Sequence, residues 1–127
     1  MTVMTTSIDT APLTPEQIAL VNPRIRLQPR EQLALRAAFA ESLPPGVEVF
    51  LYGSRVDRNA AGGDIDLLVH APGIAVDGEL ALEARLRAAL ESRLGERRID
   101  LLFTPTLGED AKPFVRLAAH GAVRLFP

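Results

Sequence analysis

LYGSRVDRNAAGGDIDLLVH, residues 51–70, is the stretch of this sequence that says most about its fold. Gly53 and Ser54 open a polar loop, which leads into an apolar strand that begins with Asp64 and Asp66. Residues two apart in a strand point to the same face, so we expect the two carboxylates side by side. Adjacent carboxylates repel each other unless a cation lies between them, and Mg²⁺ binds one or two carboxylates together with phosphate oxygens. The stretch therefore predicts a phosphate-binding loop that leads into a metal site.

The segments around this stretch predict an alternation of strands and a helix. VEVFLY, residues 47–52, is rich in β-formers, and the apolar residues of 64–70 and 97–103 predict two further strands. Between the last two, residues 78–94 predict a helix, with Asp77 as its N-cap and a C-terminal Gly95. The apolar stripe of this helix is formed by Leu82, Leu86, Leu90 and Leu94.

Two strands joined by a helix favour parallel pairing with a right-handed connection. Asp100 near the start of the third strand would then lie beside Asp64 and Asp66 near the start of the second. The residue pattern thus predicts three carboxylates at one end of the sheet. The alternative is that Asp100 simply pairs with Arg97 or Arg98.

The remaining segments predict a flexible N-terminal tail at residues 1–13 and a single domain over residues 14–127. Within the domain, Thr14, Pro15 and Gln17 are typical of a capped helix start, and the proline after Asn22 ends that helix near residue 21. Further elements are expected at residues 29–42 (helix), 111–120 (helix) and 123–126 (edge strand). The apolar face of the 29–42 helix is expected to hold Leu33, Leu35, Ala37, Ala38, Phe39, Ala40 and Ser42. The fold class is α/β (α+β), a small mixed sheet of three to four strands packed by helices.

Composition narrows the classes of function. The chain has 127 residues, 47% of them hydrophobic, no cysteine and a net charge of −2. The absence of cysteine excludes disulfides and thiolate chemistry, and the charge makes nucleic acid an unlikely partner. No apolar run is long enough to span a membrane, and the N-terminus lacks the pattern of a signal peptide, so we expect a cytoplasmic protein. Three arginines at residues 24, 26 and 30 are expected to form a solvated basic segment.

The Gly-Ser pair, the nine-residue loop and Asp64-Ile65-Asp66 resemble the motif of the polymerase-β-type nucleotidyltransferase superfamily. The chain is most similar to the smallest members, the minimal nucleotidyltransferases, and the resemblance spans residues 47–126. It implies a polymerase-β-like nucleotidyltransferase fold, ATP as substrate and two Mg²⁺ ions. The loop is slightly shorter than is common in the family, and Asp57 lies where a triphosphate would repel it unless its side chain points to solvent.

The resemblance also implies roles for individual residues. Asp64, Asp66 and Asp100 would be the catalytic and metal-binding residues, with Asp100 accepting the proton of the acceptor hydroxyl. Gly53, Ser54 and Arg55 would bind the nucleotide phosphates, with Arg58 as a weaker candidate. His70 and His120 are given no catalytic role, because a strand end and the last turn of a helix account for them.

Small members of the family act as antitoxins that transfer AMP to a hydroxyl of a HEPN-domain toxin, so the resemblance implies such a partner protein here. Two other functions stay open. One is transfer to a small-molecule hydroxyl, as in aminoglycoside nucleotidyltransferases, although those are longer. The other is a catalytically silent module that neutralises a partner by contact. Both nucleotidyltransferase functions need the three carboxylates, whereas the silent module does not.

Overall fold

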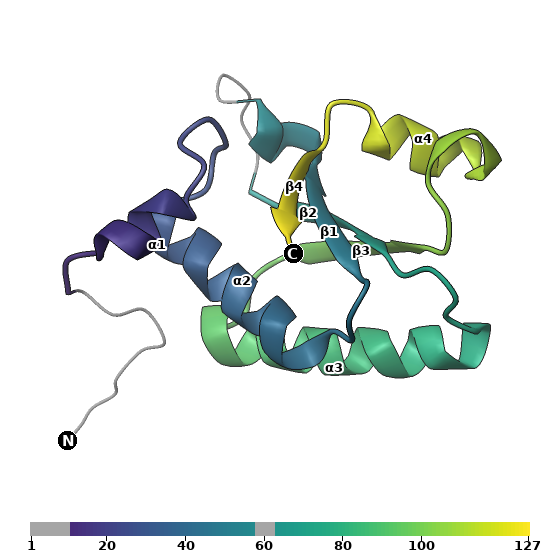
Figure 1. Cartoon of the computed structure of the whole chain (residues 1–127), viewed down its shortest axis with the longest axis horizontal. Helices are drawn as coiled ribbons and strands as arrows, with labels where there is room; N and C mark the ends of the chain where they lie inside the picture. The colour runs from purple at the N-terminus through teal and green to yellow at the C-terminus, as the bar shows by residue number, and fades with distance from the viewer. Residues whose placement is uncertain (1–10, 58–62) are drawn as a thin grey trace.

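The computed structural model describes residues 11–57 and 63–127, which form a four-stranded sheet with helices on both faces (Figure 1). Most of the predicted N-terminal tail lies outside the described residues, and residues 11–13 form no helix or strand. The elements are α1 (Pro15–Ala19), α2 (Pro29–Ser42), β1 (Glu48–Tyr52), η1 (Gly53–Val56), β2 (Ile65–His70), α3 (Val76–Leu94), β3 (Ile99–Thr104), η2 (Gly108–Asp110), α4 (Pro113–Ala119) and β4 (Val123–Phe126). The predicted α/β class with a mixed sheet is confirmed.

The strand order is β3-β2-β1-β4. β2 and β3 are parallel, as the helix between them predicted, while β1 pairs antiparallel with both β2 and β4. β4 is an edge strand, also as predicted. β2 is paired on both edges and has helices packed over both faces, and Leu67, Leu68 and Val69 are fully buried.

The main core lies between the sheet and the pair α2 and α3, which cover the same face of the sheet in Figure 1. The predicted stripe of α3 supplies Leu82, Leu86 and Leu90 to this core. α4 covers the opposite face and forms a smaller core around Leu68 and Val115. In the described part of the chain, no helix combines the length and the apolar character that a membrane span needs.

The predicted N-terminal cap is present in α1 but not in α3. The capping box of α1 is present, with Thr14 Oγ1 accepting from the Gln17 N–H at 3.1 Å. The prediction that Asp77 caps α3 is wrong, because the helix begins earlier and Ala75 is its N-cap. Asp77 lies instead in the first turn, where a negative charge is favourable beside the helix N-terminus.

The buried face of α2 differs from the predicted one at two positions. Leu35, Ala38 and Phe39 are buried as expected, whereas Ala40 is exposed and Gln32 is buried. The Gln32 amide explains its burial, because it binds the loop before the helix. Its Oε1 accepts from the Asn22 N–H at 2.8 Å, and its Nε2 donates to the carbonyls of Asn22 and Leu27 at 2.9 and 3.0 Å.

We expect Gln32→Leu to destabilise the protein although leucine fits a helix face. The substitution leaves backbone groups of Asn22 and Leu27 without their side-chain partner, at a cost of about 2 kcal/mol in the free energy of unfolding. Urea denaturation of both proteins measures this difference. A loss below about 0.5 kcal/mol, the size of an ordinary surface substitution, would contradict the structural role of the amide.

Candidate functional site

Three polar side chains form a row across the sheet at one end of β2. Tyr52 pairs with Asp66 in the β1–β2 register, and Asp66 pairs with Asp100 in the β2–β3 register. The row lies on the face that carries Leu68, since residues two apart in a strand share a face. α4 packs on that face around Leu68, and the row continues the face beyond the small core. The topology thus brings Asp66 and Asp100 together from segments far apart in the sequence.

The carboxylates of this row affect one another's ionisation. Burial raises the pKa of Asp66, and the neighbouring carboxylates of Asp100 and then Asp64 raise it further. The pKa of the Tyr52 hydroxyl is raised as well. Burial is the main cause, and the charges of Asp66 and Asp100 add to the shift. Asp66 is therefore a partly buried acid held between two others, an arrangement that favours a bound cation or a proton.

Asp64 lies one residue before β2 and faces a different neighbour. Its Oδ1 is 3.5 Å from Nε of Arg98, and its side chain is 41% exposed. Arg97 pairs with Glu31 at 2.5 Å. Both arginines that could have neutralised Asp100 thus contact other carboxylates, so the simple ion-pair explanation of Asp100 is not what the structure shows.

The donor set suits a hard cation, although the carboxylates are not already arranged around one. Within residues 11–57 and 63–127, no group of three metal-ligating side chains is gathered into a metal-binding cluster. Asp64 is paired with Arg98 instead. An exposed ion pair contributes only about 0–1 kcal/mol, so little free energy opposes turning Asp64 toward Asp66. Mg²⁺ binds carboxylate oxygens, and its positive charge would offset the repulsion between them.

Gly53 brings the backbone of the Gly-Ser turn against Asp66. Its φ is +78°, and a Cβ built at this position would overlap Oδ2 of Asp66 and lie 3.3 Å from its Cγ. Only glycine fits both the conformation and the contact. The sequence predicted a close approach of this backbone to phosphates; the approach that the structure shows is to a carboxylate of the site. Ser54 follows in η1, and its carbonyl accepts from the Asp57 N–H at 3.2 Å.

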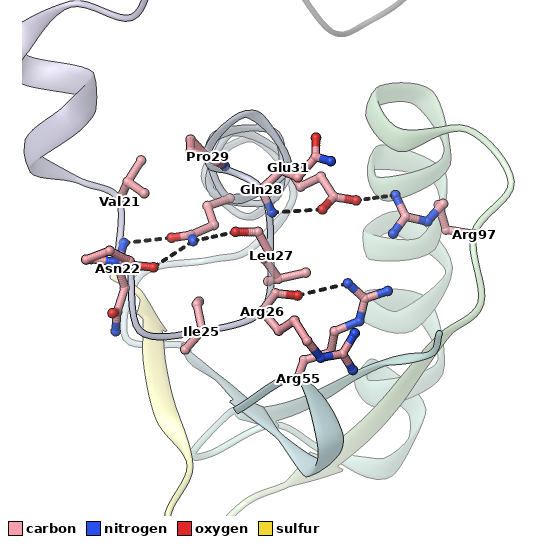
Figure 2. Close-up of a pocket in the computed structure, with 12 residues that line it drawn as sticks. Val21, Asn22, Ile25, Arg26, Leu27, Gln28, Pro29, Glu31, Arg55 and Arg97 are labelled. Carbon is pink, nitrogen blue, oxygen red and sulfur yellow. Dashed lines mark hydrogen bonds and ion pairs between the residues drawn. The ribbon is translucent and has the colours of Figure 1, made fainter. Parts of the chain in front are cut away.

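The side chain of Arg55 holds the Gly-Ser turn in place through two hydrogen bonds to backbone carbonyls. Its Nη1 donates to the carbonyl of Arg26 at 2.9 Å (Figure 2), and its Nη2 donates to the carbonyl of Gly63 at 2.8 Å. Because Gly63 directly precedes Asp64, Arg55 ties the Gly-Ser turn to the start of the acidic strand. Its predicted contact with phosphate would require these donors to be shared or released. Asp57 is exposed, as a nearby triphosphate would require, and Arg58 lies outside the described residues.

The arginines expected to form a solvated basic segment are not all alike. Arg24 is exposed, as predicted. The prediction is wrong for Arg26, whose Nε and Nη2 are buried and have no hydrogen-bond partner among the described residues.

An apolar hollow lies beside the row of Tyr52, Asp66 and Asp100, hereafter the carboxylate row. The sequence analysis did not predict this hollow. It has a volume of about 790 Å³ and extends from Tyr52 and Gly53 along α4 to His120. Phe114 and Leu117 line it and are 54% and 77% exposed. Their spacing of three along a helix was the available signal, since it puts both on one face. The hollow offers a partly apolar surface next to the acidic groups.

The two histidines are placed differently. His70 ends β2 at the far end from the carboxylate row, and its Nδ1 lies 3.0 Å from Oε1 of Glu48. That hydrogen bond, with a second from Arg124, lowers the pKa of Glu48. His120 is the C-cap of α4, as expected, and lines the apolar hollow.

No protein-family model matches this chain, and no curated protein matches it in sequence. The resemblance to the nucleotidyltransferase superfamily therefore depends on the sequence motif.

Proposed function

We propose that this chain is a Mg²⁺-dependent nucleotidyltransferase that moves AMP from ATP to an acceptor hydroxyl, with the fold of the minimal nucleotidyltransferases. In this reaction the acceptor oxygen bonds to the α-phosphorus while the bond to the β-phosphate oxygen breaks, and pyrophosphate leaves. Asp64, Asp66 and Asp100 would hold the metal ions. Asp100 is the most exposed of the three acids and is the group proposed to accept the hydroxyl proton.

Bound Mg²⁺ would supply neutralisation of the triphosphate charge and stabilise the entering and leaving oxygens. The chain's own contribution is positioning. The β2–β3 ladder holds Asp66 opposite Asp100, and Arg55 holds the start of β2 in place through Gly63. Gly53 and Ser54 offer backbone N–H groups and a hydroxyl at the same edge, where phosphate oxygens could accept hydrogen bonds.

A single observation supports this function best: the parallel register puts Asp66 beside Asp100 with Gly53 packed against the Asp66 carboxylate. The Gly-Ser turn and the acidic strand are thereby joined in space as well as in sequence. A solvated Asp-x-Asp turn would need neither the close glycine nor the raised pKa of Asp66, which burial and then Asp100 and Asp64 cause.

The proposed acceptor is a hydroxyl side chain of a separate protein, a HEPN-domain toxin, which would make this chain a cytoplasmic antitoxin. The apolar hollow along α4 supports a protein acceptor, because Phe114 and Leu117 provide exposed apolar surface next to the acidic row. A small-molecule hydroxyl, as in aminoglycoside nucleotidyltransferases, is the alternative acceptor.

Thermal unfolding with and without Mg·ATP tests the nucleotide site. At about 100 times its dissociation constant, a ligand that binds only the folded state adds about 2.7 kcal/mol of stability. We expect an upward shift of Tm that needs both Mg²⁺ and ATP in the wild type and is absent from the Asp64→Ala, Asp66→Ala variant. A wild-type Tm that does not move at millimolar Mg·ATP would contradict the proposal.

The silent binding module has two observations in its favour. Asp64 is paired with Arg98, and Arg55 is bonded to backbone carbonyls, so two expected active-site groups are engaged within the protein. The same double variant separates the two functions when a partner toxin is present. Retained control of the toxin by the variant would favour binding alone, and loss of control by a folded variant would favour catalysis.

A further inference from the structure

The outer edge of β3 lies in a groove between α3 and α4. β3 is an edge strand, because the sheet order pairs it with β2 alone. The groove has a volume of about 600 Å³ and is lined along its length by residues 101–106. Glu79 and Glu83 of α3 line it on one face of the sheet, and Phe114 and Val115 of α4 line it on the other. The groove thus combines a strand edge with walls from two helices.

The hydrogen bonds of β3 show which of its residues use their backbone to pair with β2. The carbonyls of Arg98 and Thr104 accept from the N–H groups of Ile65 and Ala71, at 3.0 and 2.9 Å. Alternate residues of a strand direct their N–H and C=O groups to the same edge. The residues between, at positions 99, 101 and 103, therefore direct theirs to the outer edge.

Most of these outward backbone groups have no partner within the described part of the chain. The carbonyl of Ile99 is covered, because Nη1 of Arg87 donates to it at 3.1 Å. No hydrogen bond with another described residue engages the backbone of Leu101 or Phe103. Both residues line the groove, so two N–H and two C=O groups face it. An unpaired strand edge of this kind is a template for pairing with another chain.

Acidic side chains predominate around the groove. Three acids (Glu79, Glu83 and Asp110) line it with one cation, Lys112, which leaves two negative charges in excess among the described lining residues. Glu83 is paired with Arg87 at 2.9 Å, whereas Glu79 and Asp110 form no ion pair with another described residue. The α3 side of the groove thus favours a basic ligand.

The α4 side of the groove is more apolar. Leu102 lies on the face of the sheet that α4 covers, and it packs with Val115 in the small core. Phe114 is 54% exposed beside them. Since successive side chains of a strand point to opposite faces, a strand added beside β3 would present alternate residues to these two different walls.

We propose that this groove binds an extended segment of a partner protein, which adds to the sheet as a strand beside β3. Its basic residues lie toward α3 and its apolar residues toward α4. Main-chain hydrogen bonds to Leu101 and Phe103 give affinity, and the alternating side chains give specificity. A second copy of this chain fits less well, because pairing of β3 with β3 brings two acidic grooves together. Binding requires neither Mg²⁺ nor ATP, so it does not depend on the proposed nucleotidyl transfer.

The probe for this test is a fluorescent synthetic peptide of alternating lysine and valine, which carries its charges on one face when extended. Fluorescence anisotropy without Mg²⁺ or ATP, at constant ionic strength, measures its binding. We expect saturable binding by the wild type, and at least about tenfold weaker binding of a peptide of alternating glutamate and valine. Absence of saturable binding of the lysine peptide, or equal affinity for the two peptides, would overturn the proposal.

Glu79→Lys tests the acidic wall. We expect this variant to lose affinity for the lysine peptide and to gain affinity for the glutamate peptide, a reversal that partial unfolding would not produce. Asp77→Lys is the matched control, because Asp77 is an exposed acid of the same helix turn that does not line the groove. It should bind both peptides like the wild type. Equal losses in the two variants would assign the binding to net charge and contradict the groove.

Backbone N-methylation tests the strand pairing itself. Only alternate residues of an added strand direct their N–H groups to β3. Peptides methylated either at the lysine or at the valine nitrogens should therefore differ, one losing affinity and the other keeping it. Equal affinities of the two methylated peptides would rule out strand addition. Sedimentation velocity of the protein alone tests the second copy: a dimer that the peptide dissociates would assign the edge to self-association and overturn the partner segment.

Discussion

Asp66→Asn is expected to abolish nucleotidyl transfer while stabilising the ligand-free protein. In the proposed reaction, losing a carboxylate that holds the metal ions should lower the rate by at least about 10²–10³-fold. The same change removes a partly buried acid whose pKa is raised by burial and then by Asp100 and Asp64. Relieving such functional strain commonly adds on the order of 1 kcal/mol. Activity is measured by pyrophosphate release with the acceptor present, and stability by urea denaturation without Mg²⁺.

The raised pKa of Asp66 determines how the stability difference between the variant and the wild type changes with pH. Because the pKa of Asp66 is higher in the folded state than in the unfolded chain, the folded state binds the proton more tightly. The Asp66 contribution is therefore least unfavourable at low pH, and stability is lost as pH rises through the raised pKa. We expect Asp66→Asn and the wild type to be similar in stability below about pH 4 and the variant to gain above it.

Asp77→Asn is the matched control for this substitution. Asp77 is an exposed acid in the first turn of α3, outside the carboxylate row. We expect it to retain full transfer activity and to be no more stable than the wild type, since a helix N-terminus favours a negative charge. If Asp66→Asn kept its activity, or if it lost stability at neutral pH, the functional assignment of this carboxylate would be wrong.

Gly53→Ala has the second large expected effect, because two costs add. The left-handed φ of +78° costs an alanine about 1–2 kcal/mol. The new Cβ would also overlap Oδ2 of Asp66, which is the end of a partly exposed side chain and can move, so this contact adds about 1 kcal/mol, the low end for overpacking. We expect a total loss of about 2–3 kcal/mol in the free energy of unfolding, measured by urea denaturation. Transfer activity should fall as well, because Asp66 must move.

Gly73→Ala separates the two costs. Gly73 has nearly the same φ, +77°, but a Cβ there would have nothing within 4 Å. It should therefore lose only the conformational part and keep its activity. Combining Gly53→Ala with Asp66→Ala should recover part of the stability, since the overlap is gone. Equal losses of unfolding free energy in the two glycine variants would show that the contact between Gly53 and Asp66 does not affect stability.

Features that depend on near neighbours in the chain could be predicted from the sequence. The capping box of Thr14 and Gln17, the leucine stripe of α3 and the edge strand β4 all follow from spacing and turn chemistry. The meeting of Asp66 and Asp100 was also predictable, because a strand–helix–strand unit constrains pairing direction and both acids lie near strand starts. Near neighbours in the chain have a fixed spacing in a helix or strand, so these signals predict the local structure directly.

The tertiary structure alone decided which partners distant side chains find. Arg55 looked available to bind phosphate, but it donates to the carbonyl of Arg26, a residue 29 positions away. Gln32 is buried because its amide meets the backbone of a loop that only the folded chain brings to it. A long polar side chain can reach many groups, and its choice depends on which backbone atoms packing leaves unsatisfied. The sequence by itself therefore determined the acidic row, while the tertiary structure decided the bracing of its loop and placed the outer edge of β3 in a groove between α3 and α4.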